Sequence, residues 1–300
     1  MEQGIACKCG AAGTGMDQIK PGLTRIVAPN GGPMTHEGTC TYVLGNHAVA
    51  VIDPGPDHDG HLNAILAAVP AGGAVSHIIV THAHRDHTQL AARLSNVTGA
   101  PVYAHAQPLL AETEFGGGEG VDYDFSPNIE VSDGQTVEGD DWSLQVLHTP
   151  GHLQSHVSLV CSSLDAIFSG DHVMDWSSTF ISPPDGSLGS YLASLDRLSA
   201  RPEKTYFPGH GPAVLDGHRR VADLRAHRHM RTAQILKSLG QGAASLNDLT
   251  ARIYHDVPAH LHPAAARNVL AHLLHLQSDD RVHCLGDAPL RDRFCITSQD

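Results

Sequence analysis

The sequence predicts an α/β protein in which two β-sheets pack face to face with helices on their outer sides, followed by a small, mostly helical C-terminal domain. Clusters of consecutive strand-like apolar runs alternate with helical patterns, which favours the two-sheet arrangement. Apolar residues make up 41% of the 300 residues, enough for a sizeable core. From His218 to Leu239 an amphipathic pattern runs unbroken until Gly240 ends it, which predicts the long helix that opens the C-terminal domain.

The remaining elements follow from the period of the apolar residues and from the turn residues between them. In the first half we expect helices near 57–69 and 87–97, and strands near 24–29, 40–45, 48–53, 76–80 and 102–104. In the second half we expect a helix near 188–199, and strands near 142–147, 156–161, 165–169 and 205–207. The C-terminal part continues with helices near 246–254 and 263–276 and a short strand near 281–285. This order of helices and strand is typical of a winged-helix domain.

Residues 81–87 read Thr-His-Ala-His-Arg-Asp-His and place three histidines and one aspartate within six positions. Residues i and i+2 of an extended chain point to the same side, so His82 and His84 are expected to bind one metal ion together. Asp86 and His87 follow where the chain turns into a helical pattern, and they are expected to face a second position. The motif therefore predicts two adjacent metal ions.

Three later strand-like runs end in residues of the same kind. Residues 149–152 read Thr-Pro-Gly-His, residues 169–171 read Ser-Gly-Asp, and residues 208–211 read Pro-Gly-His-Gly. Strand ends that converge on one rim are a common place for chemistry, and a glycine beside a ligand allows close approach of the backbone. These positions add three candidate ligands, His152, Asp171 and His210.

This series of motifs, in this order, resembles the metallo-β-lactamase superfamily of binuclear hydrolases over roughly residues 22–215. The resemblance implies a four-layer αββα sandwich. It also implies a first metal held by His82, His84 and His152, a second metal held by Asp86, His87 and His210, and Asp171 as the bridging ligand. Neutral imidazoles suit zinc, while the carboxylates also admit iron or manganese, so two Zn²⁺ ions are the expected cofactors.

The segments 27–35, 38–42 and 50–55 are similar to the opening of the lactamase-beta-like subgroup of that superfamily. This subgroup includes a mitochondrial single-strand endoribonuclease, many bacterial hydrolases and fungal thioesterases, and its members usually carry Asn where Cys40 stands. The resemblance implies a C-terminal winged-helix domain. We therefore expect four parts, in chain order a flexible leader, a catalytic domain, a winged-helix domain and a tail, over residues 1–21, 22–217, 218–285 and 286–300.

The predicted function is metal-dependent hydrolysis of a small-molecule ester, thioester, lactone or amide by a metal-bridging hydroxide. Two ions roughly 3.5–4 Å apart lower the pKa of a shared water and polarise the attacked group. Asp86 and Asp171 are the site carboxylates, so one of them is predicted to carry the proton. A Ser-His-Asp hydrolase is disfavoured because no Gly-x-Ser-x-Gly elbow occurs. The alternative is a single-strand-specific endoribonuclease that cleaves phosphodiesters.

The charge distribution favours a small-molecule substrate over RNA. Residues 1–217 carry 24 Asp and Glu against 8 Lys and Arg, whereas residues 218–285 carry 9 Lys and Arg against 5 acidic residues. An acidic catalytic domain repels a polyanion, and the third helix of the C-terminal domain carries one arginine. The arginines of the long helix are expected on its solvated face: Arg219, Arg220, Arg225, Arg228 and Arg231. The C-terminal domain is expected to pack against the catalytic domain, to wall part of the cleft, or to form a homodimer contact.

Other residues are expected to support the site. Asp53, His156 and His172 are candidates for orienting the metal ligands by hydrogen bonds. The loops 112–125 and 177–187 are expected to shape substrate choice, the second through an apolar lining by Trp176, Phe180, Ile181, Pro183 and Pro184. No apolar run reaches the length of a membrane span, and the first 20 residues lack the order of a signal peptide, so we expect a cytoplasmic protein with no membrane partner.

Overall fold

The computed structural model describes residues 15–106 and 120–297. Its first sheet has seven strands hydrogen-bonded in chain order: β1 (Gly15–Lys20), β2 (Leu23–Val27), β3 (Cys40–Leu44), β4 (Ala48–Ile52), β5 (Ala74–Val80), β6 (Val102–Ala104) and β7 (Ile129–Glu130). The first four strands pair antiparallel, whereas β4 to β7 run parallel. The parallel part places the ends of β4 and β5 at one edge, where the candidate ligands begin.

The second sheet has five strands in the order β12-β11-β10-β9-β8: β8 (Thr136–Glu138), β9 (Ser143–His148), β10 (Val157–Cys161), β11 (Ala166–Gly170) and β12 (Thr205–Pro208). Alternate residues of both sheets meet in a core that includes Tyr42 and Ile79 from the first sheet and Val146, Phe168 and Phe207 from the second. The two sheets therefore pack face to face, as expected.

Helices cover the outer face of each sheet. On the first sheet, α1 (Asp59–Ala68) and α3 (Ala91–Thr98) bury Leu62, Ile65 and Leu94 against strand residues. On the second sheet, α4 (Leu188–Ser199) and the start of α5 (Gly217–Leu239) bury Leu195 and Leu224. A one-turn helix, α2 (Arg85–Thr88), follows β5, and a 3₁₀ turn, η1 (Ser162–Leu164), joins β10 to β11. The four layers confirm the predicted αββα sandwich.

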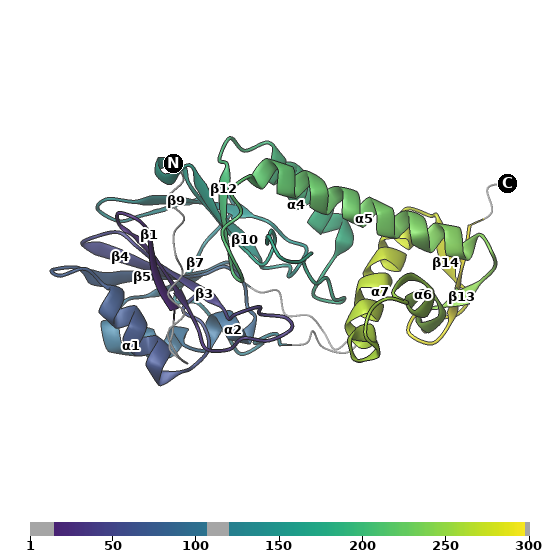
Figure 1. Cartoon of the computed structure of the whole chain (residues 1–300), viewed down its shortest axis with the longest axis horizontal. Helices are drawn as coiled ribbons and strands as arrows, with labels where there is room; N and C mark the ends of the chain where they lie inside the picture. Colours follow the sequence, from purple (N-terminus) through teal and green to yellow (C-terminus); the bar gives the residue numbers. More distant parts are fainter. Residues whose placement is uncertain (1–14, 107–119, 298–300) are drawn as a thin grey trace, which may run out of the picture.

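The long helix α5 leaves the sandwich and extends into the C-terminal domain (Figure 1). There it is joined by α6 (Leu246–Ile253), η2 (Ala259–Leu261), α7 (His262–Ser278) and a three-stranded sheet in the order β13-β15-β14. The strands are β13 (Ala244–Ser245), β14 (Val282–Cys284) and β15 (Arg293–Ile296). Helices and strands share one apolar core that includes Leu249, Leu273 and Phe294. None of the described helices is both long enough and apolar enough to cross a bilayer.

The structure differs from the expected boundaries at both ends. β1 lies within the expected leader, where it pairs with β2. β15 lies within the expected tail, yet it is the central strand of the C-terminal sheet, with Phe294 fully buried. Both strands are short and their order depends on pairing: β1 forms a hairpin with the adjacent β2, whereas β15 pairs with β14 and with β13, about 50 residues earlier.

Candidate metal centre

Each predicted ligand follows the end of a strand at the same edge of the sandwich. β5 ends at Val80 and is followed by His82, while His84 caps the start of α2, which carries Asp86 and His87. The remaining ligands follow the ends of β9, β11 and β12 in the second sheet: His152, Asp171 and His210. The structure brings all seven residues together in two adjoining groups, His82, His84, His152 and Asp171, and Asp86, His87 and His210.

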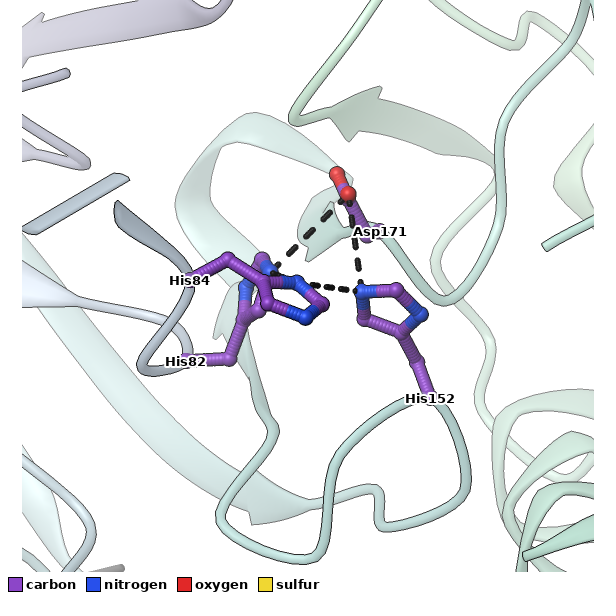
Figure 2. Close-up of side chains that lie close together, drawn as sticks. All are labelled: His82, His84, His152 and Asp171. Carbon is purple, nitrogen blue, oxygen red and sulfur yellow. Dashed lines mark hydrogen bonds and ion pairs between the residues drawn. The ribbon is translucent and has the colours of Figure 1, made fainter. Parts of the chain in front are cut away.

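In the first group three imidazole nitrogens converge on one point (Figure 2). His84 Nδ1 lies 3.0 Å from His82 Nε2 and 2.9 Å from His152 Nε2. Asp171 Oδ2 lies 3.9 Å from His82 Nε2 and 3.7 Å from His152 Nε2. Three nitrogens and one oxygen are a donor set that zinc accepts.

The second group adjoins the first through Asp171. His87 Nε2 lies 3.4 Å from His210 Nε2 and 3.6 Å from Asp86 Oδ2, and His210 Nε2 lies 3.2 Å from the same carboxylate oxygen. Asp171 Oδ2 is 3.3 Å from His210 Nε2, and Asp171 Oδ1 is 3.6 Å from His87 Nε2. Asp171 thus reaches both groups, the position that the predicted bridging ligand requires.

Hydrogen bonds on the outer side of the rings fix which nitrogen faces the centre. His152 Nδ1 donates to the carbonyl oxygen of Phe180 at 2.6 Å, and His210 Nδ1 donates to that of Gly38 at 3.3 Å. A carbonyl can only accept, so each Nδ1 carries a proton, and Nε2 of the neutral ring presents its lone pair inward. Lone pairs that face one another at about 3 Å repel unless a cation or proton lies between them.

A threonine and an aspartate orient His82 and His87 in the same way. Thr81 Oγ1 donates to Asp53 Oδ2 at 2.8 Å and therefore accepts from His82 Nδ1 at 2.9 Å. Asp53 Oδ2 also lies 3.0 Å from His87 Nδ1. Asp53 thus lies beside a proposed ligand, at ion-pair distance from His87 and hydrogen-bonded to Thr81.

Burial keeps the three imidazoles of the first group neutral. Burial and the neighbouring His152 lower the pKa of His84 to about 3. Burial and the adjacent His87 lower the pKa of His82 well below its usual value, and burial also lowers the pKa of His152. Neutral imidazoles are the form that binds a metal, so the first group is ready to do so at neutral pH.

The second group instead pairs imidazoles with carboxylates. Burial alone would lower the pKa of His87, but Asp86 and Asp53 outweigh it and raise that pKa to about 9. Burial opposes ionisation of Asp171, yet His210 and His87 hold its pKa well below the usual value. Asp171 Oδ1 is buried, and no residue in the described part of the chain forms a hydrogen bond with it. A metal cation that replaced the protons on these histidines would satisfy the same carboxylates, so the donor set fits metal ions.

Of the other two support candidates, His156 has a clear contact and His172 does not. The backbone N–H of Asp171 donates to His156 Nε2 at 3.2 Å, while His156 Nδ1 donates to Thr149 Oγ1 at 2.9 Å. His156 therefore fixes the backbone at Asp171. The ring of His172 is buried against Tyr191, and neither of its nitrogens has a hydrogen-bond partner among the described residues.

A cavity of about 300 Å³ opens onto both groups. Its apolar lining includes the predicted Trp176 and Phe180. Ile181 is instead buried, and Pro183 and Pro184 line a separate cavity against α7, because the chain turns away from the metal groups after Phe180. That part of the lining prediction is wrong. Most of the loop 112–125 lies outside the described residues, although Gly120 lines the cavity.

Sequence reasoning missed a second wall of this cavity. Pro33, Met34 and Thr35 line it, and Thr39 Oγ1 donates to Asp86 Oδ2 at 3.3 Å. Cys40, at the subgroup's usual Asn position, is buried, and its backbone N–H donates to the carbonyl oxygen of Gly209. The segment 27–35 carries no His, Cys, Asp or Glu that would have marked it as part of the site, and its similarity to the subgroup did not assign it a place in the cavity.

The expectation for the arginines of the long helix is wrong for Arg228. Its side chain is 2% exposed and donates to the carbonyl oxygen of Thr179. Arg220 also turns inward and donates to the carbonyl oxygens of Met174 and Ser177 at 2.7 and 2.8 Å. The loop beneath the cavity offers carbonyl groups that these guanidinium groups satisfy, which an amphipathic pattern in the sequence does not show.

Comparison with known proteins agrees with this geometry. A sequence model of the metallo-beta-lactamase superfamily matches residues 35–210, and one of the beta-lactamase associated winged helix domain matches residues 245–289. The beta-lactamase-like protein 2 homolog of Caenorhabditis elegans is 28% identical over 260 residues, 85% of this chain and 83% of that protein. The atrochrysone carboxyl ACP thioesterase of Claviceps purpurea is 26% identical over 253 residues, 80% of this chain and 74% of that protein.

Solved structures show the same fold. A beta-lactamase domain protein from Burkholderia ambifaria superposes with a TM-score of 0.80 at 20% identity, over 97% of this chain and 96% of that one. A metallo-beta-lactamase family protein from Thermus thermophilus superposes with a TM-score of 0.76 at 22% identity, over 93% of this chain and 100% of that one. The similarity therefore extends through the sandwich and the C-terminal domain together.

Proposed function

The chain belongs to the metallo-beta-lactamase superfamily, a family of hydrolases, and we propose that it uses two metal ions to hydrolyse a small-molecule ester, thioester, lactone or amide. The observation that carries this proposal is the position of Asp171 between two groups of ligands that open onto one apolar cavity. The residues proposed to hold the first ion are His82, His84 and His152. Those proposed for the second are Asp86, His87 and His210, with Asp171 shared. Zinc suits the imidazole-rich first group, and iron or manganese is the second choice.

Two bound ions would lower the pKa of a water between them to near neutral. The ions would also polarise the carbonyl group under attack. The protein's own part is to orient the ligands, to exclude bulk water and to move the proton. The side chain of Asp86 is 29% exposed toward the cavity, against 10% for Asp171. We therefore propose that the Asp86 carboxylate carries the proton to the leaving group. Its Oδ2 also accepts a hydrogen bond from Thr39.

The cavity lining supports an uncharged acyl substrate over RNA. None of the described residues that line the cavity is Lys or Arg, whereas a phosphodiester backbone is usually bound by such side chains. Trp176, Met174, Phe180 and Met34 offer apolar surface instead. The relative from Claviceps purpurea is named as a thioesterase, which adds support for a thioester among the proposed substrates.

The test combines metal analysis with a substrate panel. We expect zinc-reconstituted protein to hold two ions per chain and to hydrolyse at least one member of a panel of thioesters, esters, lactones and amides. The variant His84→Ala with His152→Ala should lose the first ion and the activity. His105→Ala with His148→Ala is the matched control, because these two rings lie 4.4 Å apart outside the metal groups. At most one ion in the wild type, or two ions in the first variant, would contradict the proposal.

A further inference from the structure

Residues 179–182, here called the bridging segment, contact two of the proposed metal ligands. Thr179 Oγ1 lies 2.7 Å from the carbonyl oxygen of Asp171 and 2.8 Å from that of His172, and its single hydroxyl proton is shared between these two acceptors. The carbonyl oxygen of Phe180 accepts from His152 Nδ1 at 2.6 Å. The position of this segment therefore sets both the backbone that carries the shared carboxylate and the ring orientation of His152.

The C-terminal part of the chain holds the same segment from its other side. Arg228 of α5 donates to the carbonyl oxygen of Thr179. The side-chain oxygen of Asn268 in α7 accepts from the backbone N–H of Ile181 at 3.3 Å, and it also accepts from Arg228 Nη1 at 3.3 Å. Arg267 Nε donates to Ser182 Oγ at 3.0 Å. Two helices thus fix the segment by hydrogen bonds at three of its four residues.

Burial of the Arg228 guanidinium costs stability, and its contacts with the bridging segment offset part of that cost. It is 2% exposed, and none of the ion pairs among residues 15–106 and 120–297 includes it. A buried guanidinium without a carboxylate must be satisfied by neutral acceptors and aromatic rings. Its charge lies 5.2 Å from the ring centre of Tyr191, whose hydroxyl donates to the carbonyl oxygen of His172 at 3.1 Å. Arg228 is thus connected to the backbone at residues 171 and 172 in two ways, through Thr179 and through Tyr191.

We propose that Arg228 is a positioning residue of the metal centre: through Thr179 and Tyr191 it holds the bridging segment and, with it, His152 and Asp171 in the geometry that binds metal. The inference rests on the proposed function, since it concerns the same ligands. It gives the C-terminal domain a role in building the metal centre, although none of the described cavity-lining residues belongs to that domain.

The test is to measure the affinity of the full-length protein for Zn²⁺ by competition with a chelator, alongside kcat and KM. Arg228→Met keeps the apolar stem and removes the guanidinium. Partners outside the first shell of ligands typically contribute about 10–100-fold in metal affinity, so we expect a loss of that size, together with a fall in kcat. Arg228→Lys should recover part of the affinity, because an ammonium can still donate to the Thr179 carbonyl.

The matched control is Arg225→Met. Arg225 lies on the same helix, but it forms an ion pair with Asp196 of α4 and no hydrogen bond or ion pair with the bridging segment. This variant should bind zinc as the wild type does. Thr179→Val tests the same connection from the other side, and it decides the question if Arg228→Met does not fold, because it removes a hydroxyl and leaves the buried arginine in place.

Three outcomes would count against the inference. Zinc affinity within about twofold of the wild type in both Arg228→Met and Thr179→Val would overturn it, and so would an equal loss in the Arg225→Met control. If the wild type binds two ions in these experiments, either result overturns the inference about Arg228 and leaves the proposed function standing. Wild-type protein that takes up no zinc would overturn the proposed function itself, and the inference with it.

Discussion

Gly209 lies where a side chain of any size would collide with two of the proposed metal ligands. A Cβ atom at this position would lie 2.3 Å from Asp171 Oδ1 and 2.7 Å from His87 Cε1. The backbone on both sides is fixed, since Gly209 N–H donates to Gly170 and its carbonyl accepts from Cys40. The sequence-based expectation that a glycine permits close approach beside a ligand is confirmed here.

We therefore expect Gly209→Ala to displace the Asp171 carboxylate and to impair hydrolysis. A misplacement of about 1 Å in an active site can lower the rate about 100-fold. Turnover and bound metal should be measured together, with Gly15→Ala as the control because a Cβ there meets nothing within 4 Å. Equal turnover of wild type and Gly209→Ala would contradict this prediction, because it would show that Asp171 and His87 can move aside without loss of activity.

Asp53 contacts the proposed ligand His87 directly and the proposed ligand His82 through Thr81. It is 2% exposed, its φ of +49° is uncommon for a residue other than glycine, and it accepts from both the backbone N–H and the hydroxyl of Thr81. The same carboxylate lies 3.0 Å from His87 Nδ1. An aspartate held in this strained conformation is consistent with a role in orienting His82 and His87.

Asp53→Ala should weaken zinc binding by about 10–100-fold, because it frees the ring of His87 and removes the acceptor that fixes Thr81. Chelator competition measures this loss. Asp57→Ala is the control, since Asp57 is an exposed partner of Arg93 outside the site. Unchanged zinc affinity in Asp53→Ala would mean that His87 is oriented by the metal alone.

At the scale of single elements, the strands and helices near the ligands agree with their sequence patterns. The run before His82 forms β5 and the pattern at 188–199 forms α4, because both bury an apolar face against a neighbouring layer. The inward-facing arginines of α5 were not predictable in this way. An arginine on the polar side of an amphipathic pattern is normally expected to face solvent. Arg228 faces inward because a loop 49 residues away in sequence supplies the carbonyl group that accepts its hydrogen bond.

Helix α7 carries a buried histidine, His272, whose burial is expected to make folding less favourable at acid pH. His272 is 1% exposed and contacts Thr232 of α5 at 2.9 Å. Burial, and then the positive charge of Arg228, lowers the pKa of His272 to about 3, and His275 of α7 and His227 and Arg231 of α5 act in the same direction. The neutral ring is therefore stabilised in the folded state and must take up a proton on unfolding at acid pH.

The sign of the pH effect follows from the depressed pKa of His272. Between the usual pKa of about 6.5 and the folded value, the unfolded chain binds more protons, so stability falls as the pH decreases. We expect His272→Gln to reduce the slope of unfolding free energy against pH by up to one proton, about 1.4 kcal/mol per pH unit between pH 6 and 4. Urea unfolding at several pH values measures the slope, with the exposed His255→Gln as control. Identical slopes in His272→Gln and wild type would show that the ring stays accessible to protons.

For the molecule as a whole, the sequence predicted the sandwich, the C-terminal domain and the seven residues that the structure brings together. These depend on local spacing, such as His82 and His84 two residues apart, and on strand ends that share one edge. The cavity wall at residues 33–35 and the inward-facing Arg228 depend on contacts between segments far apart in the chain. No local pattern encodes such contacts, so they required the structure.

The distribution of charge over the whole molecule bears on the choice between a small substrate and RNA. The chain has a formal net charge of −13, and α7, the helix equivalent to a recognition helix, carries one arginine, which donates to Ser182. Two arginines of α5, Arg220 and Arg228, are occupied by backbone carbonyl groups of the loop beneath the cavity. Three of the nine basic residues at 218–285 are thus engaged within the protein, which reduces the positive charge available to a polyanion.

We therefore expect little affinity for single-stranded RNA at physiological salt. If helix arginines did contact phosphates, the logarithm of the binding constant would fall with the logarithm of salt with a slope of about −0.7 per phosphate neutralised. Charge reversal at Arg219 and Arg225, whose side chains are 80% and 36% exposed, should leave hydrolysis of a small ester or thioester unchanged. Arg228 is unsuitable for this test because its reversal would bury a carboxylate beside the Thr179 carbonyl. Metal-dependent cleavage of single-stranded RNA by the wild type, lost on reversal of those two arginines, would replace the small-molecule proposal with a nuclease.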